Sequence, residues 1–247
     1  MKAMEKKKIV VMIPTYQERE NIGQVIESIL QLNSHFDLTV LVVDDNSPDG
    51  TAEVVRQLAE RDSRVKLLLR TKRRGRGTAG AAGFQAALEL NPDYVIEMDG
   101  DGSHQPGSIP DLIRAAEKAD LVLGSRYVSG GKDAERSWLR RFVTWLVRLF
   151  IRWQFRFPVK DVSSGFRCFR AEALRKIDPE DLISTGPSIV LEVLAKAHQL
   201  GLKITEVPIN FVDRKAGQTK LTFLTLLETF VMALKFKKMY ASPRAEK

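Results

Sequence analysis

Cysteine and histidine are scarce in this chain. Its 247 residues include one cysteine, Cys168, and three histidines. A single thiol excludes an intrachain disulfide and is typical of a reducing compartment. The surrounding sequence, Phe166-Arg167-Cys168-Phe169, holds no histidine that would activate a thiolate. We therefore expect Cys168 to be a buried structural thiol.

Long apolar runs and linkers are also missing. No stretch of about 18 uncharged apolar residues occurs, so no transmembrane helix is predicted. The apolar run Ile9–Ile13, behind the basic N-terminus, is too short for a signal peptide. No segment rich in proline, glycine or serine divides the chain, and it has no internal repeat. Residues 1–247 are therefore expected to form one domain.

Acidic residues are outnumbered by basic ones, 31 against 39, which gives a formal net charge of +8. Such a balance favours anionic partners: nucleic acid, phosphorylated ligands or an anionic membrane face. A merely basic surface is the alternative, and the charge alone leaves both open.

Short β-branched segments alternate with helix-period segments through the first 130 residues. This alternation predicts an α/β fold with a mostly parallel central sheet flanked by helices. Strands are expected at Ile9–Ile13, Leu38–Val43, Val65–Leu69, Tyr94–Met98 and Leu121–Gly124. Beyond Gly130 we expect a helix over Trp138–Phe157, a strand near Phe166–Phe169, a helix near Ile189–Leu200, a strand over Ile204–Phe211 and a final helix near Leu221–Met239. The pattern suggests a nucleotide-binding half, 1–130, and a half for a second, more apolar ligand, 131–247.

Carboxylates follow several predicted strands directly. Asp44-Asp45 and Asp99-Gly100-Asp101 stand where such strands end, the edge at which ligands gather in open α/β sheets. Two carboxylates one residue apart can both turn toward a hard cation, and so small a ligand set suits Mg²⁺ or Mn²⁺ carried in with a diphosphate. The alternative is a glycine-rich turn whose aspartates cap the next helix.

Three other classes of protein share part of this pattern. Neither acidic loop matches an EF-hand, because their twelfth positions are Arg56 and Pro110. Gly75–Gly80 matches G-x-G-x-x-G, the fingerprint of an NAD(P)-dependent oxidoreductase, but four residues separate it from its strand where an immediate turn is needed. A nucleic-acid-binding module would explain Lys72–Arg76 but not the acidic clusters, so no nucleic-acid partner is predicted.

Five motifs, in order, resemble the dolichyl-phosphate (polyprenyl-phosphate) mannose synthase group of family 2 glycosyltransferases: Val11–Asn21, Val43–Thr51, Glu97–His104, Gly124–Tyr127 and Phe211–Arg214. The resemblance spans residues 9–220. It implies a GT-A fold, GDP-mannose as donor, Mg²⁺ or Mn²⁺ as cofactor and a polyprenyl phosphate as acceptor. A UDP-sugar donor, as in a polyprenyl-phosphate glucosyltransferase, is the alternative within the family.

The resemblance also implies roles for individual residues. Nucleoside-binding positions match Pro14, Tyr16, Glu18, Val43 and Asp45; metal and diphosphate positions match Asp99, Gly100 and Asp101, with Ser103 as a third metal ligand; cations for donor or acceptor phosphates match Arg126, Arg214 and Lys220; and the acceptor phosphate site matches Arg140 and Thr144. The sequence departs from the family at Gly100, usually alanine, and over Thr185–Val190, which lacks an aromatic-Phe-Gln pattern.

A mechanism follows from the roles that the resemblance implies. A metal held by Asp99 and Asp101 would neutralise the leaving nucleotide, while Arg126 positions an acceptor phosphate that is already ionised near neutral pH, so direct attack would invert the anomeric centre. His104 is expected to support the acidic loop. The predicted helices over residues 138–157 and 221–239 combine aromatic and basic residues, as helices in a membrane interface do. We therefore expect a peripheral enzyme on the cytoplasmic face of a membrane.

Overall fold

The computed structural model describes residues 6–32, 36–133, 138–212 and 223–240. Strands and helices alternate through the first half of the chain, as predicted: β1 (Lys8–Thr15), α1 (Arg19–Leu30), β2 (Asp37–Asp44), α2 (Thr51–Arg61), β3 (Val65–Leu69), α3 (Arg76–Glu89), β4 (Tyr94–Glu97), α4 (Ile109–Ala116) and β5 (Leu121–Ser125). The second half contains β6 (Lys132–Asp133), α5 (Trp138–Phe155), β7 (Arg167–Arg170), α6 (Ala171–Ile177), α7 (Ile189–Gln199), β8 (Ile204–Pro208), β9 (Asn210–Phe211) and α8 (Phe223–Met239).

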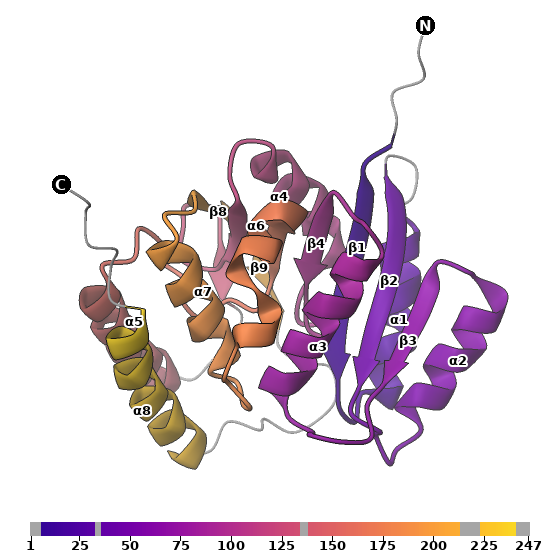
Figure 1. Ribbon diagram of the computed structural model, residues 1–247, viewed down its shortest axis with the longest axis horizontal. Coiled ribbons are helices and arrows are strands. Elements are labelled where there is room, and N and C mark those ends of the chain that lie inside the picture. The colour runs from indigo at the N-terminus through magenta and orange to yellow at the C-terminus, as the bar shows by residue number, and fades with distance from the viewer. Residues whose placement is uncertain (1–5, 33–35, 134–137, 213–222, 241–247) are drawn as a thin grey trace, which may run out of the picture.

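Seven strands form the central sheet in the order β3-β2-β1-β4-β7-β5-β8 (Figure 1). Within it β7 runs antiparallel to both β4 and β5, and the other pairs are parallel. Strand β7 therefore enters from the second half of the chain and separates two strands of the first half. The mostly parallel sheet predicted from the alternation is confirmed.

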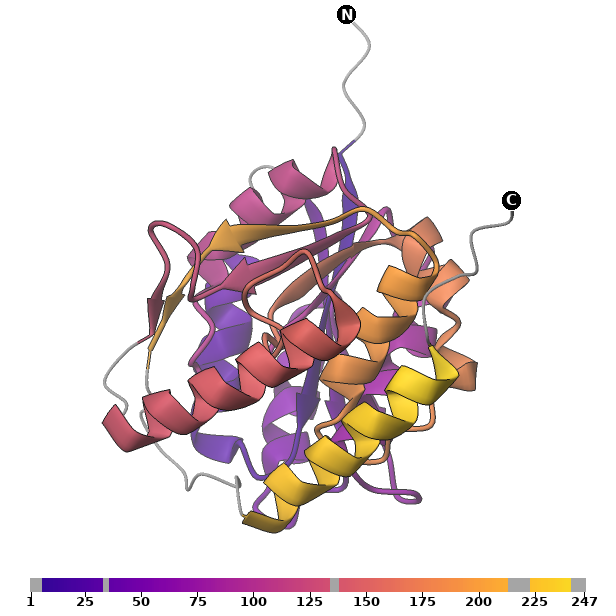
Figure 2. The same ribbon diagram turned by 90° about the vertical axis from the view of Figure 1, so that its left-hand side faces the viewer.

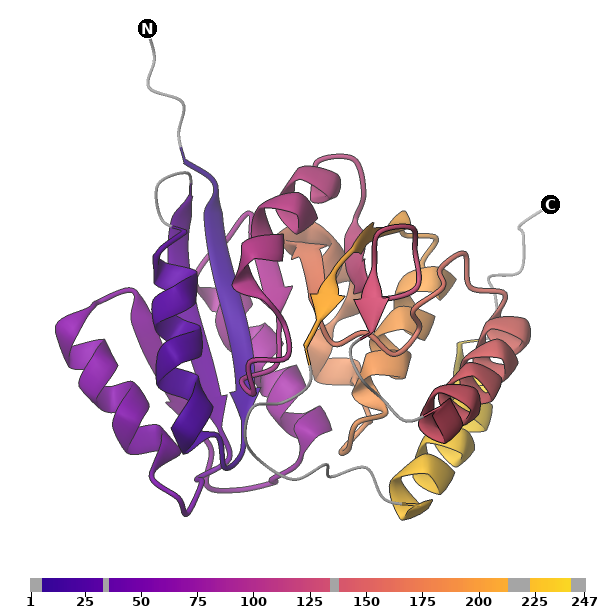
Figure 3. The same cartoon turned by 180° about the vertical axis from the view of Figure 1, so that it is seen from behind.

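Helices cover both faces of the sheet, which is why its central strands are apolar on both sides. In β1, Ile9, Val11 and Ile13 pack with α1, α2 and α4, the face seen in Figure 3. The intervening Val10 and Met12 pack with α3, α6 and α7 (Figure 1). Cys168 is buried in the same sheet, as expected, and its burial raises the pKa of its thiol.

Helices α5 and α8 lie side by side at one end of the molecule (Figure 2). Phe150 of α5 stacks on Phe230 of α8, with ring centroids 5.2 Å apart. Ile151, Phe155, Ala233 and Phe236 turn into the core. Over the described residues, no helix combines the length and apolar character needed to cross a membrane.

The strand expected over Ile204–Phe211 is divided. β8 ends at Pro208, and Asn210–Phe211 pairs instead with β6 in a separate two-stranded sheet. Pro208 has no N–H to continue a ladder, while Ile209 is buried and its N–H bonds to the Ser125 carbonyl at 3.0 Å. This division directs the chain toward the Asp99–Asp101 loop, where Val212 N–H donates to Ser103 O at 3.1 Å.

Candidate active site

Three polar segments meet at the carboxyl ends of β1, β2 and β4. Thr15 is in register with Asp44, and the N–H of Met98 bonds to the Met12 carbonyl at 3.2 Å. The structure thus places the residues after these strands at one edge of the sheet, where a ligand of an open α/β sheet binds.

The loop after β4 is closed by its own polar groups. Ser103 donates to Asp101 Oδ1 from both its backbone N–H, at 3.0 Å, and its hydroxyl, at 2.6 Å. Asp101 is 4% exposed, whereas the Asp99 side chain is 34% exposed. Ser103 therefore holds the Asp101 carboxylate in place; its predicted role as a metal ligand stays a prediction.

His104 stabilises this loop through contacts of its ring. Its Nδ1 accepts the Asp99 N–H at 3.0 Å, and its ring stacks on Phe166 with centroids 5.0 Å apart. Burial lowers the pKa of His104, and an accepting Nδ1 requires the neutral ring with its proton on Nε2. His104 is thus part of the loop's structure, as expected.

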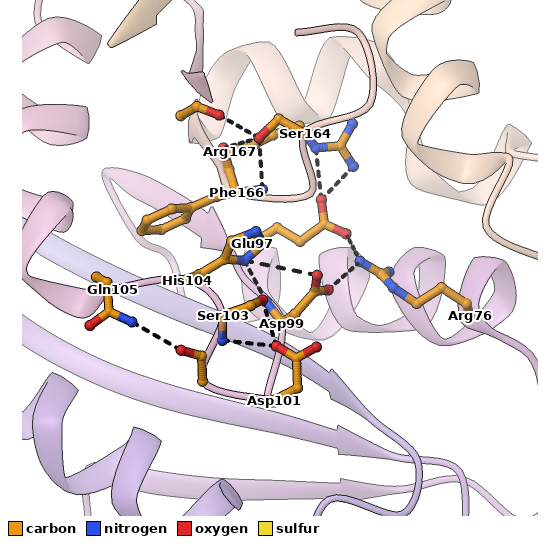
Figure 4. Close-up of polar contacts among 12 residues, drawn as sticks. Arg76, Glu97, Asp99, Asp101, Ser103, His104, Gln105, Ser164, Phe166 and Arg167 are labelled. Atoms are coloured by element: carbon orange, nitrogen blue, oxygen red, sulfur yellow. Dashed lines mark hydrogen bonds and ion pairs between the residues drawn. The ribbon is translucent and has the colours of Figure 1, made fainter. Parts of the chain in front are cut away.

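Next to the loop lies a group of four charged residues, here called the charge cluster: Arg76, Glu97, Asp99 and Arg167 (Figure 4). Glu97, fully buried, accepts from Arg167 Nε at 2.8 Å and from Arg76 Nη2 at 2.8 Å. Arg76 Nη2 also lies 3.4 Å from Asp99 Oδ1. Burial opposes the charge on Arg76, but the carboxylates of Glu97 and Asp99 outweigh it and raise the pKa of Arg76.

Arg76 and Arg167 were not identified from the sequence. Glu97 indicates that such a partner exists, because a carboxylate inside a buried strand needs a cation. Its partner Arg167 stands directly opposite on β7, but this register follows only from the order of the strands. Arg167 also donates to the Val190 carbonyl at 3.0 Å, which ties the cluster to α7.

The last residue of β2, Asp44, and the residue that follows it, Asp45, have separate contacts. Asp44 is fully buried and accepts from the hydroxyls of Thr15 and Ser47, at 3.0 and 2.6 Å, so it closes the turn. Asp45 pairs with Arg70 and accepts the Gly75 N–H at 2.7 Å. The basic loop 70–76 therefore contacts Asp45 at its start and, through Arg76, Asp99 at its end.

The glycines around the start of α3 have a packing reason. Gly77 N–H donates to Thr185 O at 2.9 Å, and a Cβ on Gly77 would lie 2.3 Å from Ser184 O. Glu192 in turn holds that segment by accepting the N–H groups of Ile183 and Ser184, each at 2.8 Å. The glycine pattern thus permits close backbone packing here.

The other predicted nucleoside-binding residues border the same edge. Tyr16 is 38% exposed, and Glu18 N–H donates to Thr51 Oγ1 at 3.0 Å. Val43 faces α3 in the core, where a Cβ on Gly83 would meet it at 2.9 Å. A nucleoside contact from Val43 would therefore come from its backbone.

Arg126 is engaged inside the protein. Its Nε and Nη2 bond to the two oxygens of Asp161, each at 2.8 Å, and Nη2 also donates to Ser163 at 2.8 Å. Burial opposes its charge, but Asp161 outweighs this and raises the pKa of Arg126. The structure thus gives Arg126 a buried ion pair that the sequence did not indicate, and its phosphate contact stays a prediction.

The residues predicted to hold the acceptor phosphate belong to α5. Arg140 and Thr144 are on this helix, but their side chains lie outside the described part of the structure, as do Arg214 and Lys220 entirely. One turn further along α5, the Arg148 guanidinium lies 3.7 Å from the centre of the Tyr127 ring. This contact joins α5 to the loop that carries Arg126.

Asp99 and Asp101 have the chemistry of metal ligands. Carboxylate oxygens suit Mg²⁺ or Mn²⁺, and Asp99 is accessible enough to reach one. Among the described residues there is no group of three or more His, Cys, Asp or Glu side chains that would hold a metal. The pair therefore fits a cation that takes its remaining ligands from a diphosphate and water.

The sequence pattern of the family described as "Glycosyl transferase family 2" matches residues 10–178. This chain belongs to that family. It is a glycosyltransferase, so the oxidoreductase alternative is wrong, and the glycines of its G-x-G-x-x-G segment serve the packing described above.

Curated relatives of this family 2 glycosyltransferase match most of its length. An undecaprenyl-phosphate mannosyltransferase of Micrococcus luteus is 39% identical over 215 residues, 87% of this chain and 88% of the relative. A polyprenol monophosphomannose synthase of Mycolicibacterium smegmatis is 37% identical over 86% of this chain and 80% of the relative. A dolichol-phosphate mannosyltransferase of Pyrococcus furiosus is 35% identical over 90% of this chain, which spans 61% of that longer protein.

Solved structures establish the fold of this glycosyltransferase. Glucosyl-3-phosphoglycerate synthase of Mycobacterium tuberculosis, in complex with Mn²⁺, UDP and glucosyl-3-phosphoglycerate, has a TM-score of 0.70 at 20% identity and covers 97% of this chain and 82% of its own. The same enzyme with Mn²⁺, UDP-glucose and glycerol 3-phosphate has a TM-score of 0.69. The predicted GT-A fold is confirmed.

Proposed function

We propose that this glycosyltransferase moves mannose from GDP-mannose to a polyprenyl phosphate, with inversion at the anomeric carbon. The observation that carries the proposal is the agreement of the three relatives, whose names all combine mannose with a polyprenol or its phosphate at 35–39% identity. The geometry supports it with an acidic loop suited to a nucleotide diphosphate and a basic, aromatic helix, α5, that contacts Tyr127 next to Arg126.

Asp99 and Asp101 would hold Mg²⁺ or Mn²⁺ at the donor diphosphate. When bound, the cation would neutralise the charge that develops on the departing nucleotide. Val212, two residues before Arg214 in the sequence, donates its N–H to the Ser103 carbonyl in this loop. Arg214 and Lys220 are therefore proposed as cations for the donor phosphates.

The acceptor needs positioning more than activation, because a phosphate monoester is ionised near neutral pH. The buried, neutral His104 supports the loop and is not needed as a general base. Arg140 and Thr144, four residues apart on α5, share a helix face and are proposed to hold the acceptor phosphate. Arg126, joined to α5 through Tyr127 and Arg148, is proposed to stabilise this arrangement.

Asp45 is proposed to recognise guanine. Arg70 and the Gly75 N–H each contact one of its oxygens, and a carboxylate oxygen has a second lone pair that can accept. Guanine offers both a ring N–H and an amino group to such an acceptor, whereas uracil offers one donor. Equal protection by GDP and UDP in thermal-shift titrations with Mg²⁺ would count against this assignment.

Helices α5 and α8 are proposed to rest in the membrane interface on the cytoplasmic face. They expose large apolar side chains next to basic ones: Trp145, Leu149 and Trp153 on α5, Phe230, Val231 and Leu234 on α8, and Arg152, Arg156 and Lys237 around them. Contiguous apolar residues with a basic border suit an anionic lipid surface. An acceptor phosphate held near Arg140 would then keep its prenyl chain in the lipid.

The test is a donor screen with radiolabelled GDP-mannose, UDP-glucose and UDP-N-acetylglucosamine, each with polyprenyl phosphate and Mg²⁺ or Mn²⁺. The product is extracted into organic solvent and its anomeric configuration determined. We expect label in the organic phase from GDP-mannose, with inversion at the anomeric carbon. Label only from a UDP-sugar would replace the donor assignment, and label in water-soluble product would overturn the acceptor.

A further inference from the structure

The four residues of the charge cluster carry equal numbers of opposite charges. The cluster holds two carboxylates, Glu97 and Asp99, and two guanidinium groups, Arg76 and Arg167. Arg167 is committed to Glu97 and to the Val190 carbonyl. Arg76 is shared, because one nitrogen, Nη2, contacts Glu97 at 2.8 Å and Asp99 at 3.4 Å. Asp99 is therefore already paired with Arg76 when a cation arrives.

A divalent cation on Asp99 and Asp101 must compete with this pairing. If Asp99 turns to the cation, Arg76 and Arg167 are left to share Glu97, and one positive charge in a largely buried cluster loses its partner. A cation alone would add to that excess charge. A nucleotide diphosphate removes it, because its oxygens supply negative charge to the cation and to Arg76 at once.

The backbone that carries Arg76 is also the one that contacts Asp45. Gly75 N–H bonds to Asp45 at 2.7 Å, and Arg76 follows it as the first residue of α3. Gly77 is pinned to Thr185 O at 2.9 Å. The guanidinium thus extends from a fixed backbone that lies between the nucleoside side and the metal side of the donor site.

We propose that Arg76 is a positioning residue that keeps Asp99 paired until a nucleotide diphosphate arrives, so that the divalent cation binds tightly only together with the nucleotide. The inference rests on the proposed donor site. It assigns the coupling between cation and nucleotide to one side chain, and this coupling is reciprocal by thermodynamic linkage.

The experiment measures Mn²⁺ affinity by calorimetry and by the Mn²⁺ electron paramagnetic resonance signal, with and without GDP. The variants are Arg76→Met, which removes the charge and matches the aliphatic part of the side chain, and Arg76→Lys, which keeps the charge. Arg74→Met is the matched control, because Arg74 is exposed on the same loop. Arg76→Gln is a second neutral variant, and thermal unfolding confirms that each protein is folded.

We expect Arg76→Met to bind Mn²⁺ without nucleotide about tenfold more tightly than wild type, the low end for a charged hydrogen bond. The same variant should bind GDP in the presence of Mn²⁺ more weakly, by a similar factor. These opposite changes distinguish positioning from general damage, which would weaken both. Arg76→Lys and Arg74→Met should resemble wild type.

The outcome that overturns the inference is a folded Arg76→Met or Arg76→Gln whose nucleotide-free Mn²⁺ affinity and GDP dependence equal those of wild type. Failure of the proposed donor site gives a different result. In that case neither wild type nor variant binds Mn²⁺ in the presence of GDP or UDP, and the inference falls with it.

Discussion

Replacing Glu97 with glutamine tests how far the fold depends on the charge cluster. Glutamine keeps the size of the side chain and one acceptor oxygen, but it removes the charge that both Arg76 and Arg167 face. Glu97 is fully buried and Arg167 nearly so, at 1% side-chain exposure. Removing one partner of a buried ion pair leaves an uncompensated charge and destabilises a protein by about 3–5 kcal/mol.

The expected change is large enough to measure directly. A chain of this size loses roughly 2–4 °C of melting temperature per kcal/mol, so Glu97→Gln should lower Tm by about 6–20 °C. Differential scanning calorimetry and urea titration would measure it. The matched control is Asp62→Asn, which breaks an ion pair with Arg64 whose side chains are 28% and 32% exposed. Such a surface pair contributes about 0–1 kcal/mol, so its Tm should change by less than about 4 °C. If Glu97→Gln melts no earlier than Asp62→Asn, the charge balance of the cluster does not stabilise the fold.

Three further predictions concern activity and membrane binding. Asp101→Asn should lower turnover by about 10²-fold or more, as loss of one electrostatic stabiliser does, whereas the exposed Asp111→Asn on α4 should not; full activity of Asp101→Asn, or of wild type in excess EDTA, would contradict the metal assignment. Arg140→Ala should raise the KM for polyprenyl phosphate about ten- to hundredfold while GDP binding stays nearly unchanged; equal weakening of both would show that donor and acceptor sites are not separate. Trp153→Ser should weaken binding to anionic vesicles, measured by co-sedimentation, about tenfold or more, because Trp153 is 72% exposed on α5. Ile183→Ser, which changes an exposed apolar residue elsewhere, is the control. Equal vesicle binding by the two variants would argue against a membrane-binding surface on α5.

The central strands could be predicted because each is a short apolar run with a clear end. β1, β2 and β5 are almost wholly buried, and apolar residues on both faces are the signature of a covered parallel sheet. The acidic loop could be predicted for the same reason, since carboxylates directly after such strands stand at the ligand-binding edge. In both cases the information is local in the sequence.

The electrostatic partners could not be predicted, because they depend on long-range register. Glu97 meets Arg167 across 70 positions of sequence, and Arg126 meets Asp161 across 35. Pairing of this kind follows from where β7 and the segment before it return to the sheet. Asp44 and Asp45 look equivalent in the sequence but have different contacts in the structure. Neighbouring residues of a strand face opposite ways, so Asp44 closes a turn and Asp45 faces the basic loop.

The antiparallel strand β7 bears on how the chain can be divided. Residues 167–170 bond to β4 on one side and β5 on the other, so two strands of the first half meet only through a strand of the second. A fragment ending near residue 130 would expose the facing edges of β4 and β5, and unpaired edges of buried, apolar strands invite aggregation. The first half of the chain is therefore not expected to fold as a separate module. Chimaeras that exchange α5 or α8, the proposed membrane-facing helices, between relatives should therefore keep the seven-stranded sheet intact and should not join half-chains.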